Sequence, residues 1–441
     1  MTQQPFFRRD LSLFDASLLV VGCIIGAGIF RTPSSIAAHL HSPFLILLVW
    51  LIGGLFSLCG ALCCAELAAS FPKAGGDYIF ITESYGRLAG FLFGWTKLFI
   101  ERTGTVAVLG VVFAEYLRFV FPFTDEAVKS IACFAIFALT LANIIGVSWG
   151  KWVQNAFALL KIASLAAMVG AGLVRWASSP SASSFVMGPL NVSTFQSLGV
   201  GLIFVLWTYG GWTEAAYVAE EVKDPERNLP RAIVLGLLLT MTLYLAVNAV
   251  YLAFLSPQEM AGEKLVAAAV MERMFGRGSG NLIAMLVSLS AFGALNGYIL
   301  TGARILYALG RDHSLFARLA KLHPQFKTPI TALWFNAAAA MMLVLTKSFD
   351  QILTYTTVAI WVFFGLAGAS LFVLRRKYPT LKRPYRVWGY PVVPILFLAS
   401  TLFFIVNACL TEPRESFFGL GLVALGLPLY GLSRWMERDR G

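Results

Sequence analysis

Charged residues are scarce in this sequence. Only 13% of the 441 residues are Asp, Glu, Lys or Arg, against roughly a quarter in soluble domains. Hydrophobic residues make up 58%, and the mean hydropathy is +0.75. The scarcity of charge excludes a soluble globular protein and predicts an all-α integral membrane protein.

Histidine and cysteine are also few, and neither forms a recognisable site. The four histidines, His39, His41, His313 and His323, lie in or near loops, and no H-E-x-x-H, G-x-S-x-G or complete phosphate-binding loop is present. The sequence therefore predicts no metal, no cofactor and no enzyme. All six cysteines fall within apolar runs, so we expect reduced, buried thiols: Cys23, Cys59, Cys63, Cys64, Cys133 and Cys409.

Basic residues outnumber acidic ones, and the net charge is +11. They lie in the loops between apolar runs, which favours a positive-inside bias over nucleic-acid binding. Most of them gather on one side of the membrane, as in the basic segment from Arg375 to Arg386. That side also holds both ends of the chain, so the N- and C-termini are predicted to be cytoplasmic.

Twelve apolar runs are each near the ~20 residues that a membrane span needs. The first begins near Leu11, is too long for a signal peptide and lacks a small-residue cleavage site, so we expect a retained helix. The runs are 13–38, 43–70, 88–121, 129–148, 153–175, 195–219, 230–255, 280–308, 330–346, 351–374, 390–411 and 416–433.

The twelve predicted helices form one transmembrane domain over residues 1–441. Five helices in residues 11–175 and five in 195–375 would have opposite orientations, because five is odd. Each half opens with a glycine-interrupted helix, the pattern of an inverted repeat. Two additional helices in residues 390–435 lie outside the repeat.

The first interruption is Gly26-Ala27-Gly28. A broken helix in a bilayer is tolerated where protein or water satisfies the freed backbone groups. The outer half-helix would then present free N–H groups to a carboxylate, and the last carbonyls of the inner half, near Ile24, would accept from an ammonium group. The alternative is close helix packing, because Gly22 and Gly26 also form a small-xxx-small pair.

Several segments together resemble the amino acid–polyamine–organocation superfamily, and within it the L-type amino acid transporters. The resemblance extends over most of residues 11–410, and the segment after residue 207 is its most specific part. The matching segments are Gly-Ala-Gly-Ile-Phe at 26–30, the loop Phe71 to Tyr78, Trp207 to Trp212, Glu220 to Pro225, Arg227 to Pro230, and Leu295-Asn296-Gly297 with Arg304.

The resemblance implies a fold of five-plus-five helices with helices one and six broken. It also implies a site in which the N–H groups of Gly26, Ala27 and Gly28 hold a substrate carboxylate. The carbonyls of Ile24, Trp207 and Gly210 would hold the amino group, and Trp207 would cover the substrate as an aromatic gate. A lipid-facing or core tryptophan is the alternative for Trp207.

Lys161 lies well inside the fifth apolar run, where an ammonium group needs a partner or water. By the resemblance, it takes the place of a structural sodium ion, with Tyr244 as its neighbour. Two roles stay open, a fixed cation or a group that loses its proton and couples transport to pH. Snorkelling to an interface is the structural alternative.

Helix three carries Lys97, Glu101 and Arg102, and the first two are one turn apart. We expect Lys97 and Glu101 to form a structural ion pair rather than to bind substrate. Glu66 and Glu220 lie near the cytoplasmic helix ends, where solvated or loop-pairing roles are expected.

Arg31 and Glu214 depart from the residues common in this superfamily. Glu214 could attract a cationic side chain, and Arg31 could repel one from the outer mouth. An Arg31–Glu pair or separate structural roles are equally open. No cysteine lies between Phe121 and Lys129, where light subunits of the family carry a disulfide to a partner glycoprotein, so no disulfide-linked heavy subunit is expected.

The function expected from the resemblance is sodium-independent transport of neutral L-amino acids, by exchange or permeation, through alternating access in a bacterial inner membrane. Proton-coupled uptake through Lys161 and a cationic amino acid or polyamine substrate at Glu214 are the alternatives. A non-transporting amino acid sensor is a further class, for which no output domain is visible.

Overall fold

The structure is a computed structural model, and it describes residues 9–26, 28–145, 147–178, 192–263, 265–276, 278–346, 349–411 and 413–438. Its elements are helices. Across these ranges no strand forms, and a single isolated parallel bridge joins Leu11 to Val222.

Two helices in the first part of the chain, α1 (Leu13–Ile24) and α3 (Pro43–Ser70), begin at serine caps. Ser12 caps the first helix, because its hydroxyl accepts from the Asp15 N–H at 3.2 Å while the Asp15 carboxylate accepts from the Ser12 N–H at 2.8 Å. The elements are α1 (Leu13–Ile24), α2 (Gly28–Ala37), α3 (Pro43–Ser70), α4 (Asp77–Tyr85), α5 (Arg87–Thr96), the π-helical turn η1 (Lys97–Glu101), α6 (Arg102–Val120), α7 (Asp125–Ile145) and α8 (Val147–Ser178).

The second part repeats this order with a broken helix first. A short helix follows α3 in the first part, and two short helices follow α11 in the second. The elements are α9 (Val192–Thr208), α10 (Glu214–Tyr217), η2 (Ala219–Glu221), α11 (Pro225–Phe254), α12 (Pro257–Gly262), α13 (Val266–Phe275), α14 (Ser279–Asp312), η3 (Ser314–Ala320), α15 (Ile330–Thr346) and α16 (Phe349–Lys377). The division into two inverted repeats stays a prediction.

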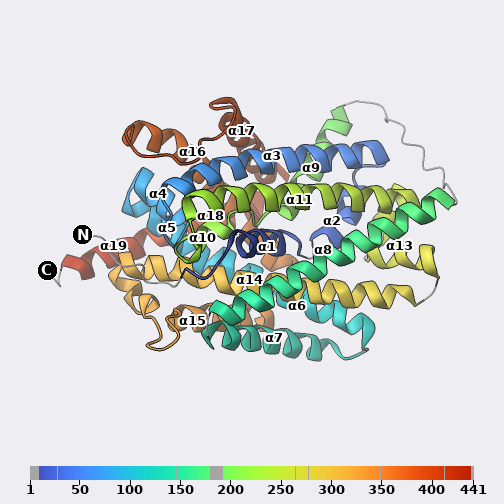
Figure 1. Ribbon diagram of the computed structural model, residues 1–441, viewed down its shortest axis with the longest axis horizontal. Coiled ribbons are helices and arrows are strands. Elements are labelled where there is room, and N and C mark those ends of the chain that lie inside the picture. The colour runs from blue at the N-terminus through green and yellow to red at the C-terminus, as the bar shows by residue number, and fades with distance from the viewer. Residues whose placement is uncertain are drawn as a thin grey trace.

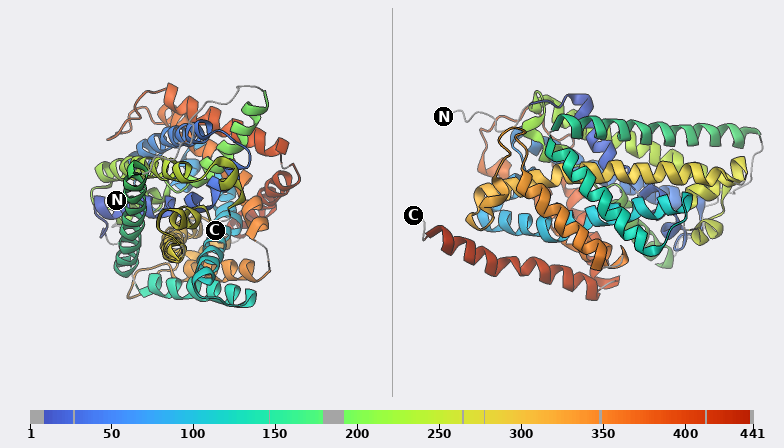
Figure 2. Two further views of the ribbon diagram at one scale, coloured as in Figure 1. Left: turned by 90° about the vertical axis from the view of Figure 1, so that its right-hand side faces the viewer. Right: turned by 90° about the horizontal axis from the view of Figure 1, so that it is seen from below.

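Three helices complete the chain: α17 (Val392–Thr411), α18 (Pro413–Ala424) and α19 (Gly426–Arg438). The helix α19 runs along one edge of the bundle (Figure 2). The first and last described segments lie at the same end of the molecule (Figure 1), which agrees with an even number of crossings.

The prediction of an all-α membrane protein is confirmed. Ten helices of the described ranges are long and apolar enough to cross a membrane, and two shorter apolar helices, Thr194–Thr208 and Ile330–Thr346, bring the set to the predicted twelve. The largest difference from the predicted runs is in 195–219, where α9 stops at Thr208 and only four residues form α10. Two consecutive glycines, Gly210 and Gly211, separate them.

The broken helix α1 lies at the centre of the bundle (Figure 1). It packs against α8, α11 and α14, while α3 packs along α11 and α6 along α14. Apolar side chains from all of these helices form one buried core. The first break is therefore enclosed by protein on several sides, which is where a bilayer tolerates irregular backbone.

Candidate functional site

The first break frees backbone carbonyls at the end of α1. Ile25 leaves helical geometry with φ −74° and ψ 81°. The Gly26 N–H then donates to the Ile24 carbonyl at 2.8 Å instead of to Gly22, four residues back. The Gly22 carbonyl is left for another donor. Ala27, the middle residue of the predicted interruption, lies outside the described residues.

Lys161 of α8 supplies that donor. Its ammonium Nζ donates to the carbonyls of Gly22 and Ile25, at 2.7 Å each, and its side chain is buried. The Ser290 hydroxyl of α14 also donates to the Ile25 carbonyl, at 3.3 Å. Charge-assisted hydrogen bonds of this length are stronger than neutral ones, so Lys161 joins α8 to the broken end of α1.

Tyr244 of α11 reaches the same stretch from another side. Its hydroxyl donates to the Ile24 carbonyl at 2.8 Å, and its ring packs against Trp50 and Tyr209 with centroids 5.6 and 5.2 Å away. The Ile24 oxygen thus accepts from both Tyr244 and Gly26, which uses its two lone pairs. A substrate amino group would have to replace one of these donors to bind there.

The second break lies directly against the first. Gly211 has a φ of +114°, and a Cβ on it would be 3.2 Å from both the Cys23 carbonyl carbon and the Ile24 nitrogen. Glycine is required there by both backbone conformation and space. The Trp207 carbonyl accepts from the Gly210 N–H at 3.0 Å, and both residues keep some accessible surface.

The start of α2 packs on the end of α9. The Thr32 hydroxyl donates to the Gly28 carbonyl at 2.9 Å and lies 3.0 Å from the Thr208 hydroxyl. A Cβ on Gly28 would be 2.7 Å from the Thr208 methyl group. Glycine at this position therefore allows the outer half of the first broken helix to approach the second.

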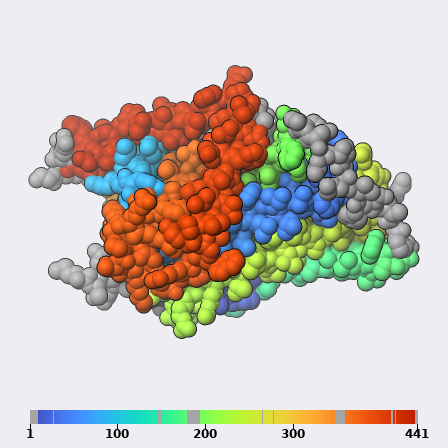
Figure 3. Space-filling view, turned by 90° about the horizontal axis from the view of Figure 1, so that it is seen from above, coloured from blue at the N-terminus to red at the C-terminus, as the bar shows by residue number. Residues whose placement is uncertain are grey.

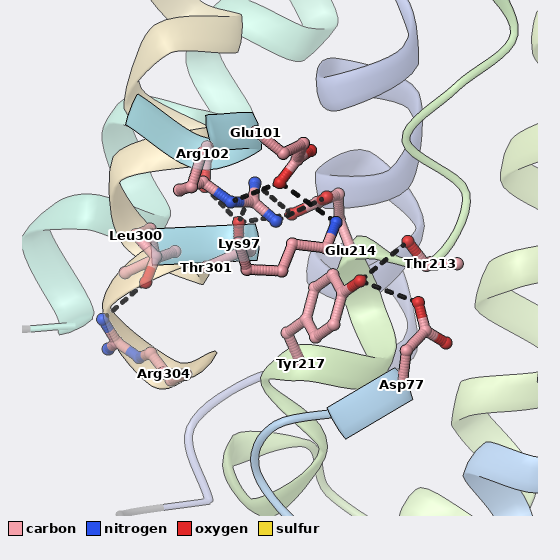
Figure 4. Close-up of polar contacts among 11 residues, drawn as sticks. Asp77, Lys97, Glu101, Arg102, Thr213, Glu214, Tyr217, Leu300, Thr301 and Arg304 are labelled. Carbon is pink, nitrogen blue, oxygen red and sulfur yellow. Dashed lines mark hydrogen bonds and ion pairs between the residues drawn. The ribbon is translucent and has the colours of Figure 1, made fainter. Parts of the chain in front are cut away.

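A buried network of charges lies beside the second break (Figure 4). Arg102 donates to both carboxylate oxygens of Glu214 at 3.1 Å, and Thr301 of α14 donates to the same carboxylate. The predicted Lys97–Glu101 ion pair is present at 3.0 Å, and Arg102 Nε lies 3.6 Å from Glu101. All four charged side chains are at most 8% exposed.

The turn η1 explains how helix three presents three charged side chains inward. Lys97 to Glu101 form a π-helical turn between α5 and α6, and such a turn shifts the side chains that follow it around the helix axis. Tyr298 of α14 lies under the Arg102 guanidinium, with its ring centroid 4.9 Å away, and a Cβ on Gly211 would be 3.2 Å from its hydroxyl. Tyr298 thus separates the network from the second break.

Two further polar contacts lie near the network, and Figure 4 shows the first of them. The Tyr217 hydroxyl of α10 donates to Asp77 at 2.8 Å, where α4 begins. Burial raises the pKa of Asp77 to about 6, although the nearby Lys97 ammonium lowers it. Arg304 donates to Glu221 at 2.8 Å, and both side chains are buried.

The remaining predicted residues have protein partners. Arg31 lies 3.9 Å from Glu115, and both side chains are more than 40% exposed. Glu66 accepts from Arg375 at 2.9 and 2.6 Å, and Glu220 accepts from the Ala74 N–H at 3.1 Å. The six cysteines are free, and within the described ranges no group of three His, Cys, Asp or Glu side chains could hold a metal.

Sequence reasoning missed three partners in this region. It gave no role to Ser290, to Asp77 or to the pairing of Arg102 with Glu214. Arg102 and Glu214 are separated by 112 positions in the chain. The available signal was the placement of both charges in apolar runs, which implies a partner without saying which one.

Comparison with known proteins gives consistent matches over nearly the whole chain. The family model described as amino acid permease matches residues 11–419. The chain is 32% identical to the Large neutral amino acids transporter small subunit 2 of Oryctolagus cuniculus and to the Asc-type amino acid transporter 1 of Mus musculus, each over 444 residues, 98% of this chain and 82% of the relative. It is 31% identical to the Serine/threonine exchanger SteT of Bacillus subtilis (strain 168) over 434 residues, 97% of this chain and 98% of the relative.

Proposed function

Because this chain belongs to the amino acid permease family, we propose that it carries neutral L-amino acids across a membrane by alternating access, as a sodium-independent exchanger or permease. It is a transporter and not an enzyme. The observation that carries the proposal is the direct contact between two broken helices at Gly211 and Ile24. The end of α1 and the break after α9 meet there, and α2 begins close by, so carbonyl ends and an N–H end lie near one another, as an amino acid's two charges require.

Each end of the substrate has a place in this arrangement. The carboxylate would bind the N–H groups where α2 begins, at Gly28 and Ala27, together with the Gly26 N–H once that group leaves the Ile24 carbonyl. The amino group would bind the carbonyls of Trp207 and Gly210. The Ile24 carbonyl would become available only when its hydrogen bond from Tyr244 or from Gly26 breaks. The partly exposed Trp207 ring would cover the side chain.

The pairing of Glu214 with Arg102 favours a substrate with a neutral side chain. Both of its carboxylate oxygens accept from Arg102, so a cationic substrate would have to compete with a buried guanidinium. This disfavours the cationic amino acid and polyamine alternative. Arg31 likewise has Glu115 close by, at 3.9 Å, and its role in selectivity stays a hypothesis.

Sodium independence is supported by Lys161. Its ammonium occupies the space between Gly22, Ile25 and α8 with two short hydrogen bonds to carbonyls, which are the groups that a sodium ion would also need. We favour a fixed cation there, with Tyr244 bracing the neighbouring carbonyl. Proton coupling through Lys161 is the second candidate mechanism.

The membrane setting completes the proposal. We propose a bacterial inner membrane with both termini cytoplasmic, on the basis of the loop charges. The relatives named as a small subunit imply assembly for those proteins, whereas residues Phe121 to Lys129 contain no cysteine here. We therefore propose that no disulfide-linked partner is needed.

Counterflow in proteoliposomes tests the function. Purified protein is reconstituted with unlabelled serine, leucine or lysine inside, and uptake of each labelled amino acid is followed. Accumulation of a neutral amino acid driven by internal neutral amino acid, unchanged when choline replaces sodium, is the expected result. Uptake stimulated by sodium would contradict the proposal, and equal competition by a decarboxylated amine such as cadaverine would favour the polyamine alternative.

The gate is tested separately with Trp207→Ala. Loss of the aromatic cover should strongly reduce counterflow while leaving membrane insertion intact. Trp388→Ala, at a side chain that is 79% exposed, serves as the matched control and should transport normally. Normal counterflow by Trp207→Ala would place the ring outside the pathway.

A further inference from the structure

A small cavity opens on the surface at the end of α16. It has a volume of about 430 Å³ and is lined by Phe372, Val373, Arg376 and Lys377. Two of these side chains are apolar and two are cationic. A cavity of this size falls in the range of small-ligand sites, about 300–1,000 Å³, and its lining matches a ligand with one acidic end and one apolar end.

The residues around the cavity are fixed by contacts with Tyr390 and Glu66. The Arg375 guanidinium stacks on the Tyr390 ring at 3.8 Å and donates to Glu66 at 2.9 and 2.6 Å. The Phe372 ring also packs against Tyr390, with centroids 5.5 Å apart. Arg375 is thus neutralised by Glu66 and does not line the cavity, whereas Phe372 does.

The surrounding segment has more positive charge than its acidic neighbours balance. From Arg375 to Tyr390 the sequence has six basic residues and no acidic one. Glu66 pairs with Arg375 and lies 3.6 Å from Arg383, and Glu226 pairs with Lys382 at 2.9 Å. Lys377 donates to the Glu83 carbonyl at 2.7 Å, and the Glu83 carboxylate accepts from Tyr378. Arg376 and Arg386 are exposed, and neither pairs with any residue that the structure describes.

The position of the segment fits the boundary between lipid and water. It follows the last residues of a membrane-crossing helix, Ala359–Lys377, and lies toward the end of the molecule that holds the termini (Figures 1 and 3). Trp388 is 79% exposed and Val392 is 60% exposed. Exposed tryptophan beside arginine is typical of a membrane interface.

We propose that this cavity binds one anionic phospholipid of the cytoplasmic leaflet. Its phosphate contacts Arg376 and Lys377, and its first acyl carbons lie on Phe372 and Val373, which line the cavity with them. Arg386, ten residues further along the same basic segment, adds positive charge to this surface. Arginine forms paired hydrogen bonds to a phosphate, and basic residues at the cytoplasmic surface attract anionic lipids. The inference uses the proposed orientation only to name the leaflet, and it does not depend on the transported substrate.

The test is lipid retention by the purified full chain in detergent micelles, measured by native mass spectrometry during titration with dioleoyl phosphatidylglycerol or dioleoyl phosphatidylcholine. One phosphatidylglycerol should bind more tightly than any phosphatidylcholine. The double variant R376Q/R386Q should lose about 25-fold in affinity, since each basic residue near the surface contributes about fivefold. The control Arg434→Gln, at an exposed residue of α19, should bind as the unmutated protein does.

Two further measurements separate loss of the lipid site from misfolding and from simple phosphate binding. The variant R376K/R386K retains both charges and should keep most of the affinity, which guards against misfolding of the glutamine variant. Inorganic phosphate at millimolar concentration should not displace the lipid, because it lacks the acyl chains. Equal binding of the two lipids, equal loss in Arg434→Gln, or displacement by phosphate would each overturn the proposal.

Discussion

Arg102 has more partners than any other charged side chain in the centre of the molecule. It forms two hydrogen bonds to Glu214, contacts Glu101 at 3.6 Å and lies over the ring of Tyr298 at 4.9 Å. None of this charge reaches water, because Arg102 is 0% exposed. A buried pair of this kind adds little net stability when complete but costs several kcal/mol when one partner is lost.

The pair is therefore expected to show strong coupling in a double-mutant cycle. Arg102→Met should lower the free energy of unfolding by about 3–5 kcal/mol, because it leaves the Glu214 carboxylate buried and unpaired. The double variant R102M/E214Q should recover most of that loss. Free energies from denaturant titration in micelles give the measurement, and losses that simply add would contradict a direct pair.

Lys161 makes a second prediction at this scale. Lys161→Met removes the two hydrogen bonds that the ammonium group donates to the Gly22 and Ile25 carbonyls. Each hydrogen bond from a charged group contributes about 1.5–3 kcal/mol to stability. Counterflow should then be abolished or unbalanced. Lys129→Met, at an exposed lysine of α7, is the matched control. Unaltered exchange by Lys161→Met would remove the ammonium from the transport mechanism, whereas loss of a strong proton-gradient dependence would favour the proton-coupled candidate.

Asp77 predicts how stability depends on pH. Burial raises its pKa in the folded protein from 3.8 to about 6, so the folded protein binds a proton that the unfolded chain releases. Its contribution, on the order of 3 kcal/mol, is fully present below about pH 4 and is lost as the pH rises through about 6. Asp77→Asn should remove this slope, measured by thermal unfolding between pH 4 and 7. The control Asp125→Asn, at an exposed residue, should keep the slope.

Residues near in sequence were predicted well, and distant pairs were not. The Lys97–Glu101 pair follows from a spacing of four on one helix. The partner of Glu214 does not, because 112 positions separate it from Arg102 and the packing of both α6 and α10 against α14 brings them together. The same holds for Arg31, whose neighbour Glu115 lies on another helix.

At the scale of elements, the two broken helices follow from local chemistry. The positions of the glycines correctly predicted where the two helices are broken, because the backbone freedom of glycine weakens an apolar helix at that point. The length of each half of a broken helix could not be predicted from the sequence. The run 195–219 is predicted as a span interrupted at its glycines, but its second half is expected to be as helical as its first, whereas α10 is only four residues long. Tertiary packing decides such lengths.

Gly211→Ala tests whether contact between the breaks is required. A methyl group there would meet backbone atoms of α1 at 3.2 Å and would force a positive φ on an L residue. Such strain costs about 1–3 kcal/mol, so both folded yield and counterflow should fall. Gly431→Ala, on α19 with no atom within 4 Å of the added carbon, should be neutral or slightly stabilising. An unaffected Gly211→Ala protein would mean that the breaks separate easily.

At the scale of the whole molecule, charge in the loops predicts how the bundle is oriented in the membrane. The sequence predicted twelve crossings and their order because hydropathy and length are local properties. It could not predict which helices surround α1, since apolar faces alike in composition pack in many ways. The placement of α19 along one edge is of this kind (Figure 2).

The orientation makes a direct prediction. Green fluorescent protein fused after the last residue should fluoresce in a bacterial host, and alkaline phosphatase at the same position should be inactive, because the C-terminus is expected in the cytoplasm. The reverse pattern would place the termini outside. The lipid site would then face the other leaflet, while its affinity in micelles would be unchanged.

The bridge between Leu11 and Val222 bears on how quickly the protein can change state. The Leu11 N–H donates to the Glu221 carbonyl at 2.9 Å, and the Leu11 carbonyl accepts from the Lys223 N–H at 2.8 Å. Leu11, just before α1, and the segment that follows α10 are thus joined by two backbone hydrogen bonds on the side where the termini lie. Moving one segment without the other would break both hydrogen bonds, at about 0.5–1.5 kcal/mol each, so we expect the two segments to move together across a single barrier. Single-molecule distance traces would then contain two dwell states and no half-opened one.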